Sequence, residues 1–298
     1  MRFLGAVLAT LLLLPGSSLA AGPGAPTPAR VTILYDAFGD RAGLERDWGF
    51  SALVEYAGRR ILFDAGNDGE VFARNVRALH VDLRRLDFAV ISHRHGDHTG
   101  GIGYLLQVNP KLTIYAPNER FGLFGGPVPA TIIRPVAALP ERMRYFGGVV
   151  PAELESSSPW PRAHFVRIDS LTEVAPGVAI VSTISRTPGT LELHELSLVL
   201  RTPAGLVVFV GCSHPGIETI LEATRPYGEH VHEIFGGLHL LATPDAEIER
   251  IARALRDDWR LELIAPGHCT GEPAFDALAR AFGDRYVYAG LGTVVELL

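Results

Sequence analysis

The sequence contains very little lysine. Lys111 is the only lysine among 298 residues, and the 27 lysine and arginine residues are outnumbered by 33 acidic residues, which gives a formal net charge of −6. The chain therefore has no excess of positive charge with which to bind a phosphate backbone. We exclude nucleic acid as a primary partner and expect a small-molecule substrate.

Cysteine and long apolar runs are also scarce. The two cysteines, Cys212 and Cys269, are too few for the disulfide framework of a small secreted domain. Beyond the N-terminal segment, no stretch approaches the roughly 20 continuous apolar residues that a transmembrane helix needs. We expect a globular domain with no stable membrane span, and the sequence does not set its oligomeric state.

The N-terminal segment is typical of an exported protein. Arg2 precedes an apolar run from Phe3 to Leu14, and small residues up to Ala20 then form a cleavage site. This pattern predicts a signal peptide over residues 1–20, and an uncleaved anchor is the alternative. Residues 21–30 are predicted to be a flexible tether, and the folded domain to cover residues 31–298 of a periplasmic or secreted protein.

Short β-rich runs alternate with amphipathic helical stretches along the domain. Strands are predicted at 31–35, 51–56, 60–63, 88–91, 178–183, 197–201, 206–210 and 261–265. One helix is predicted to be capped by Asn67, and another to begin with Thr243 as its cap and Pro244 in its first turn. Each half begins with antiparallel hairpins, which favours two similar halves over a doubly wound parallel sheet.

Between residues 120 and 161 this pattern weakens into glycine, proline and serine with scattered aromatic residues such as Tyr145 and Trp160. Long irregular segments inside compact domains are usually lids or flexible loops. The aromatic content favours a lid, so we predict a lid-like insertion at about 120–161.

The strongest chemical signal is His93-Arg94-His95-Gly96-Asp97-His98, directly after the strand predicted at 88–91. Neutral histidine nitrogen and aspartate oxygen are good ligands for zinc and similar metals. A tight turn at the end of a strand can direct alternate residues at separate metals. The segment therefore predicts a metal site.

This segment resembles the H-x-H-x-D-H signature of the metallo-β-lactamase fold superfamily at every defined position. Three later segments, Gly-Cys-Ser-His-Pro-Gly-Ile at 211–217, Phe-Gly-Gly-Leu-His-Leu at 235–240 and Pro-Gly-His-Cys-Thr-Gly at 266–271, resemble its dihydropterin-ribofuranosylaminobenzene-phosphate synthase-like branch. The resemblance covers about residues 31–298. It implies an α/β fold, a four-layer αββα sandwich of two mixed β-sheets, with the site where the strand ends meet.

The resemblance also implies a ligand set for two metals. His93 and His95 would bind one metal, and Asp97, His98 and the last histidine, His268, would bind the second. We expect Zn²⁺, two ions per chain, with Mn²⁺ or Fe²⁺ as alternatives.

His214 would complete the ligand set of the first metal. Many members of the superfamily place a histidine in a Thr-Pro-Gly-His loop, but this chain has Thr187-Pro188-Gly189-Thr190 there. His214 follows the strand predicted at 206–210 and is expected to replace the missing ligand. The alternative is a histidine buried in the core.

Two further residues resemble positions next to the metals. Asp64 matches the family's aspartate that accepts a hydrogen bond from a metal-bound histidine, and a turn aspartate is the alternative. Cys212 stands where many relatives have a metal-bridging aspartate. It is a buried thiol, a metal ligand or a disulfide partner of Cys269, and we favour the buried thiol, packed beneath the metals without reaching them.

Three more residues are weaker candidates. His239 follows two glycines that allow close backbone approach, so it is either a residue that touches substrate and stabilises developing charge, or a packing or surface histidine. His194 and Glu195 precede the strand predicted at 197–201 and are expected on the rim of the site or on a solvated face.

Two neighbouring metals can lower the pKa of water and stabilise charge on a carbonyl or phosphoryl group. With no G-x-S-x-G nucleophile in the sequence, the first hypothesis is a metal-dependent hydrolase of a phosphoester, lactone or other acyl substrate, in which Asp97 also orients the attacking water. The branch implies an alternative, a synthase joining a pterin to a ribofuranosyl-aminobenzene phosphate. A metal-dependent oxidoreductase of the same fold would favour glutamate where Gly96 stands, and a β-lactamase would need the missing loop histidine.

Overall fold

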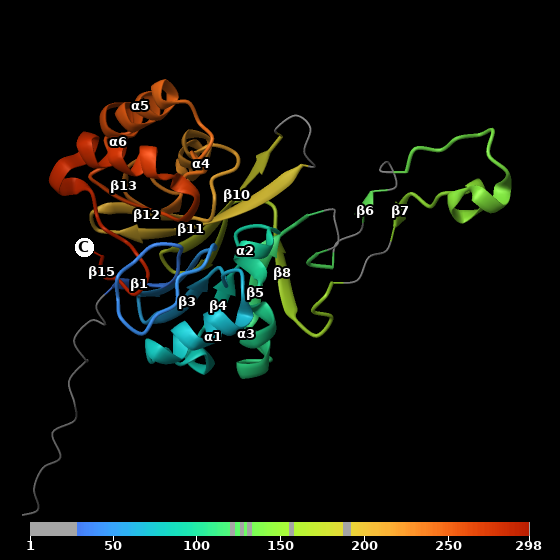
Figure 1. Cartoon of the computed structure of the whole chain (residues 1–298), viewed down its shortest axis with the longest axis horizontal. Helices are drawn as coiled ribbons and strands as arrows, with labels where there is room; N and C mark the ends of the chain where they lie inside the picture. Colours follow the sequence, from blue (N-terminus) through green and yellow to red (C-terminus); the bar gives the residue numbers. More distant parts are fainter. Residues whose placement is uncertain are drawn as a thin grey trace, which may run out of the picture.

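A computed structural model describes residues 29–119, 123–125, 128–129, 133–154, 158–186 and 192–297. Two mixed β-sheets pack face to face, and helices cover the outer face of each sheet (Figure 1). The predicted four-layer αββα sandwich is therefore confirmed. The predicted signal peptide, most of the tether and the Thr187-Pro188-Gly189-Thr190 loop lie outside the described residues. Within the described part of the chain, no helix is long and apolar enough to cross a membrane.

The first sheet contains seven strands: β1 (Arg30–Tyr35), β2 (Ser51–Tyr56), β3 (Arg59–Phe63), β4 (Phe88–Val90), β5 (Thr113–Pro117), β8 (His164–Ile168) and β15 (Val294–Glu296). Their order is β15-β1-β2-β3-β4-β5-β8. The pairs from β15 to β3 are antiparallel, and those from β3 to β8 are parallel. The turn between β2 and β3 uses Ala57 and Gly58 at φ 48° and 75°, the backbone that two-residue hairpins require. β3 begins at Arg59, one residue before the predicted start of this strand.

The second sheet contains six strands: β9 (Thr172–Ala175), β10 (Val178–Ser185), β11 (Leu193–Thr202), β12 (Gly205–Val210), β13 (Val231–Gly237) and β14 (Leu263–Gly267). Their order is β14-β13-β12-β11-β10-β9. β9 to β12 pair antiparallel, and β12, β13 and β14 pair parallel. Both halves thus begin with antiparallel hairpins, as predicted, and parallel strands follow in each. β11 begins four residues before the predicted start, and β14 begins two residues after it.

Among the described residues, six α-helices accompany the sheets: α1 (Gly69–Ala78), α2 (Gly96–Thr99), α3 (Ile102–Val108), α4 (Ile217–Thr224), α5 (Asp245–Arg253) and α6 (Glu272–Phe282). Two predicted helix starts are wrong by about one residue. The side chain that caps α1 belongs to Asp68, not Asn67, and accepts hydrogen bonds from the backbone of Glu70 and Val71. Pro244 directly precedes α5 rather than lying in its first turn, so Thr243 is not the cap.

Three apolar clusters separate the four layers. One lies between the two sheets and includes Phe63, Phe209 and Phe235, of which the last two stack with ring centroids 5.1 Å apart. A second lies between the second sheet and α4, α5 and α6, and the third lies between the first sheet and α1 and α3. Because both sheets are buried on two faces, their strands are rigid supports for the residues that follow them.

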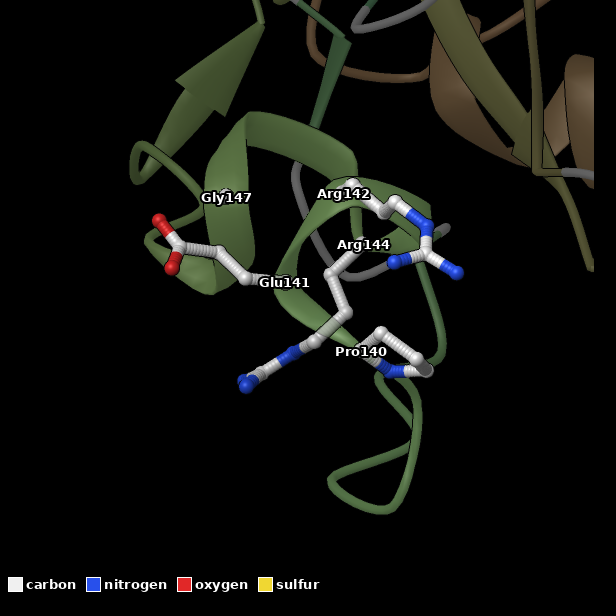
Figure 2. A pocket seen from close by; sticks show the side chains of 5 residues that line it. All are labelled: Pro140, Glu141, Arg142, Arg144 and Gly147. Atoms are coloured by element: carbon white, nitrogen blue, oxygen red, sulfur yellow. The ribbon is translucent and has the colours of Figure 1, made fainter.

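Within the predicted insertion, residues 133–154 belong to an arm that extends away from the sandwich (Figure 1). It carries the short strands β6 (Val128–Pro129) and β7 (Glu153–Leu154) and two 3₁₀ turns, Glu141–Met143 and Tyr145–Gly148. Figure 2 shows a hollow in this arm, around which Glu141, Arg142 and Arg144 point in different directions. The hollow gathers no converging polar groups, and the role of the insertion as a lid stays a prediction.

Candidate metal centre

Five strands end next to one another and position the candidate site. Asp64 follows β3, Ser92 and His93 follow β4, and the segment 211–214 follows β12. His239 comes two residues after β13, and His268 directly follows β14. The predicted convergence of His93, His214 and His268 is confirmed. The ring centroid of His93 lies 4.9 Å from that of His214 and 4.2 Å from that of His98, which in turn lies 4.9 Å from that of His268.

The first group of potential ligands consists of His93, His95 and His214. One ring nitrogen from each lies within 4.8 Å of the others. Burial holds the pKa of His93 well below its usual range, helped by the nearby His98, and also lowers the pKa of His95. Burial, together with the neighbouring histidines, lowers the pKa of His214 to about 3. All three imidazoles are therefore neutral at pH 7, the form that binds metals.

The second group consists of Asp97, His98 and His268, again with one ligand atom from each within 4.8 Å of the others. Burial opposes ionisation of Asp97, but its contact with His268 and the nearby His98 hold its pKa well below the usual range. Trp48 Nε1 donates a hydrogen bond to Asp97 Oδ2 at 3.0 Å. The carboxylate is thus ionised and oriented. These two groups match the two ligand sets that the resemblance implies.

Asp64 lies behind the histidines and orients two of them. Its Oδ2 accepts hydrogen bonds from the Ser92 hydroxyl and from His98 Nδ1, both at 2.7 Å. Since the single hydroxyl proton of Ser92 goes to Asp64, the Ser92 oxygen accepts the N–H of His93 Nδ1 at 2.9 Å. Both histidines then hold Nδ1 as a donor, which leaves Nε2 for a metal.

The negative charge of the Asp64 carboxylate also stabilises positive charge on the neighbouring His98 side chain or on a metal bound to it. Burial disfavours the protonated imidazole of His98, but the adjacent Asp64 carboxylate raises the pKa of His98 to about 9. The same negative charge would stabilise a metal cation bound at Nε2. The Asp64 carboxylate accepts hydrogen bonds from Ser92 and His98. It therefore orients a metal ligand, as the resemblance implies, and is not itself placed as a ligand.

Glu195 is not on the rim of the site, and the expectation that it lies there or on a solvated face is wrong. It lies within β11 and is fully buried. Its Oε1 accepts hydrogen bonds from the backbone of Cys212 and Ser213, and its Oε2 accepts one from the backbone of His214. Burial raises the pKa of Glu195 to about 7, although these three backbone donors oppose the rise. The carboxyl group fixes the loop that carries His214.

His194, the neighbour of Glu195, is also buried in β11. Its backbone donates a hydrogen bond to Glu119 Oε1 at 3.1 Å, and its Nε2 contacts Glu192 Oε1 at 2.9 Å. His194 belongs to neither of the two groups of potential metal ligands.

Cys212 and Cys269 are both free and buried, so the disulfide alternative is not the arrangement in this structure. Cys212 Sγ lies 3.2 Å from His98 Nε2 and within ligand range of His93. The thiol is therefore buried, as we favoured, but it does not lie clear of the histidines. Because His93 and His98 belong to different groups, Cys212 lies at the junction between them. This geometry makes it a further potential ligand.

His239 is exposed at the mouth of the cluster, with its ring centroid 4.2 Å from that of His214. Its Nδ1 or Nε2 also lies within ligand range of the Cys212 and Cys269 thiols. The contact with Cys269 raises the pKa of His239 above its usual value. Exposure leaves the imidazole available to a substrate and equally fits a surface histidine, so both predicted roles of His239 stay predictions.

Backbone strain concentrates at this site. Asp64, Ser213, His239 and His268 have φ between 48° and 63°, in the left-handed region that non-glycine residues rarely adopt. Such residues persist only where the surrounding structure holds them, and they cluster at functional sites. Gly211 has a different constraint, because a Cβ atom there would lie 2.2 Å from Ser92 Oγ.

Sequence reasoning missed Asp36, which directly follows β1 and is fully buried. Its Oδ2 accepts the backbone N–H of His268 at 3.0 Å, and burial raises its pKa to about 8. Asp36 could have been identified as a candidate from the sequence, because it directly follows a predicted buried strand, as Asp64 does. Trp48, whose ring centroid lies 5.0 Å from that of His268, gave no signal.

The donor set fits metal ions. Among the described residues, His214 Nε2 and both ring nitrogens of His268 are buried without a hydrogen-bond partner. Leaving such groups unpaired is costly unless something binds them. The two groups together offer five imidazole side chains and the Asp97 carboxylate as ligands. Zinc and similar first-row cations prefer such nitrogen and oxygen ligands.

The sequence model of the metallo-β-lactamase superfamily matches residues 49–268. The chain belongs to this superfamily. The fold implies divalent metal binding, and the predicted resemblance is confirmed.

Several similar proteins span most of the chain. The 7,8-dihydropterin-6-methyl-4-(beta-D-ribofuranosyl)-aminobenzene-5'-phosphate synthase of Methanocaldococcus jannaschii is 26% identical over 89% of this chain and 95% of its own. Tm1679, described as a metal-dependent hydrolase of the beta-lactamase superfamily, is 27% identical with a TM-score of 0.68 over 90% of this chain and 99% of its own. A diphosphatase from the PhnP family shares the fold. It is 12% identical with a TM-score of 0.52, and the match covers 91% of this chain and 98% of its own.

Proposed function

We propose that this member of the metallo-β-lactamase superfamily is a metal-dependent hydrolase that acts on a phosphoester, lactone or other acyl substrate. The observation that carries the proposal is the pair of three-residue ligand groups, His93, His95 and His214 beside Asp97, His98 and His268. The similarity to Tm1679 over nearly the full length supports it.

The first group would hold one metal and the second group another, with Zn²⁺ as the expected ion and Mn²⁺ or Fe²⁺ as alternatives. Bound there, the metals supply an activated water and stabilise negative charge that develops on the substrate. The protein contributes the geometry. Asp64 and Ser92 fix the orientation of His93 and His98, Glu195 fixes the loop of His214, and Asp36 fixes the backbone of His268.

Asp97, which is also one of the proposed metal ligands, and His239 are the proposed catalytic residues. Asp97 is ionised and accepts the Trp48 N–H, so its carboxylate is positioned to orient a water molecule for attack. His239 is exposed at the mouth of the cluster and its pKa is raised, so it is suited to donate a hydrogen bond or a proton to the substrate.

A synthase is the second candidate, and one observation favours it. The synthase of Methanocaldococcus jannaschii matches 89% of this chain and 95% of its own length. A synthase of that kind would join a pterin to a ribofuranosyl-aminobenzene phosphate, and the same metals and the same residues would then stabilise charge during group transfer.

The test compares the two reactions on one preparation. Purified protein is analysed for bound metal and assayed with chromogenic phosphomonoesters, phosphodiesters and lactones, and separately for condensation of a pterin with a ribofuranosyl-aminobenzene phosphate. We expect hydrolysis that stops on chelation and returns with zinc, and that is lost in His95→Ala. Condensation without hydrolysis would replace the proposal by the synthase. Metal-free protein that is fully active in either assay would contradict both.

We also propose that residues 1–20 direct export and are removed. The support is the pattern of Arg2, the apolar run and the small residues up to Ala20. N-terminal sequencing of protein recovered from the periplasm or medium should begin near Ala21. Protein that begins at Met1 and stays inside the cell would contradict this proposal.

A further inference from the structure

A second cluster of metal-binding residue types lies at the other end of β13 from the histidine centre. It consists of His230, His232 and Glu262, with one potential ligand atom from each within 4.8 Å of the others. β13 is seven residues long, so its two ends lie roughly 20 Å apart at about 3.3 Å per residue. The cluster is therefore separate from the proposed catalytic site.

The backbone places the three side chains together. His230 and His232 flank Val231, the first residue of β13, where the pairing with β12 shifts register, and one ring nitrogen of each lies within 4.8 Å of the other. Glu262 directly precedes the β14 region, and its backbone N–H donates to the carbonyl of His232 at 3.1 Å. The His230 carbonyl in turn accepts the N–H of Leu206 at 2.9 Å, so hydrogen bonds from two neighbouring strand segments fix the His-x-His segment.

Glu262 contacts both imidazoles. Its Oε1 lies 3.1 Å from His230 Nε2, and its Oε2 lies 3.2 Å from His232 Nδ1. The second contact does not have hydrogen-bond geometry, and neither ring nitrogen of His232 has a hydrogen-bond partner among the described residues. The His232 side chain is only 4% exposed. A buried imidazole with both nitrogens unpaired is costly, and a bound ion would satisfy it.

The neighbouring backbone leaves room for the two rings. Gly205 has a φ of 135°, and a Cβ atom there would lie 2.8 Å from His230 Cδ2 and 3.2 Å from His232 Cβ. Any other residue at this position would push the histidines out of place. Glycine at the start of β12 thus preserves the arrangement.

We propose that His230, His232 and Glu262 form a binding site for a divalent transition-metal ion of the zinc class. Two imidazole nitrogens and one carboxylate oxygen are ligands that such ions prefer, and three protein ligands leave a position for water. His230 and Glu262 are about half exposed, so an ion can reach the site from solvent. The ion would connect β13 to the segment before β14 and stabilise the folded state.

The test counts zinc with the catalytic ligands intact. Wild type, His230→Gln and Glu262→Gln are dialysed at neutral pH against the same zinc buffer, and the zinc content per chain is measured. His164→Gln, which removes an exposed histidine on β8, is the matched control. We expect wild type and the control to hold one zinc ion more per chain than either cluster variant, with hydrolytic activity unchanged in all four. The exposed residues are substituted because replacing the buried His232 would also disturb the packing of the fold.

A second measurement uses stability. Added zinc should raise the Tm of wild type further than that of Glu262→Gln, because the ion binds only the folded cluster. Equal zinc content and equal zinc-dependent Tm in wild type and both cluster variants would overturn the proposal. This outcome is independent of the proposed hydrolase, whose metals are removed by different substitutions.

Discussion

The buried carboxyl group of Glu195 accepts a hydrogen bond from the backbone N–H of His214 at 2.8 Å. Its other oxygen accepts the N–H groups of Cys212 and Ser213. The conformation of the loop that carries His214 therefore depends on Glu195, which belongs to neither group of potential metal ligands. Substitution of a residue that orients a metal ligand typically lowers metal affinity or activity by about 10- to 100-fold.

We predict that Glu195→Gln weakens metal binding by about 10- to 100-fold and lowers the free energy of unfolding by about 1–3 kcal/mol. An amide has one acceptor oxygen, so its NH₂ group would face at least one backbone N–H that the carboxylate now satisfies. Metal affinity is measured by competition with a chelator, and stability by urea unfolding. Glu222→Gln, on the exposed face of α4, is the control and should change stability by less than about 0.5 kcal/mol. Equal behaviour of the two variants would contradict the role of Glu195.

We predict that His95→Ala and His268→Ala each lose metal and activity while the domain stays folded. The three apolar clusters hold the sandwich together without the metals, unlike the core of a zinc finger. Elemental analysis measures the metal, and circular dichroism measures the fold. His164→Ala is the control and should keep wild-type metal content. Global unfolding of the two variants would indicate that these histidines support the fold rather than a catalytic centre.

We predict that Cys212→Ser lowers metal occupancy, because Cys212 Sγ lies 3.2 Å from His98 Nε2 and within ligand range of His93. Cobalt-substituted wild type should show a thiolate charge-transfer band that the variant lacks. Cys269→Ser serves as the comparison, since Cys269 is not grouped with His93 or His98. Unchanged metal content with only a loss of stability would favour the buried thiol that packs beside the metals.

Glu233 gives a prediction about pH. It lies in β13 with 1% of its surface exposed, and burial raises its pKa to about 7. An acid with a raised folded-state pKa stabilises the fold below its unfolded pKa, and this contribution is lost as the pH rises through the folded pKa. Wild type should therefore lose stability between about pH 4.5 and 7, by up to about 3 kcal/mol.

The matched variant is Glu233→Gln, which has nearly the same shape and cannot ionise. Its Tm should approach that of wild type near pH 4.5 and exceed it increasingly up to about pH 7, after which the difference levels off. Thermal unfolding of both proteins across this range measures the effect. Two parallel curves would show that Glu233 does not ionise with a raised pKa.

The sequence could predict those parts of the fold and of the site that depend on residues close to one another in the chain. The hairpins, most strands and the segment His93–His98 depend on local alternation, turn residues and spacing, and so does the position of His268 after a buried strand. Glu195 and Asp36 could not be assigned in this way, because each supports a histidine from a distant part of the chain. Glu195 reaches a loop 17 to 19 residues further on, and Asp36 reaches His268, which is 232 residues away. The Glu195 contact arises only when β11 pairs with β12, and the Asp36 contact arises only when the first sheet packs against the second.

The pairing of β15 with β1 has a consequence for the connectivity of the fold. Arg30 pairs with Glu296, so the two ends of the described domain lie side by side at the edge of the first sheet. Chains with adjacent termini tolerate circular permutation, and exposed loops accept new termini. A permutant joined between these ends by a short linker and opened within the arm, at residues 133–154, would place the half with His214 and His268 before the half with His93 and His95. It should reach the same fold with the same metal content, because the centre depends on which strand ends meet and not on the order in which they are synthesised.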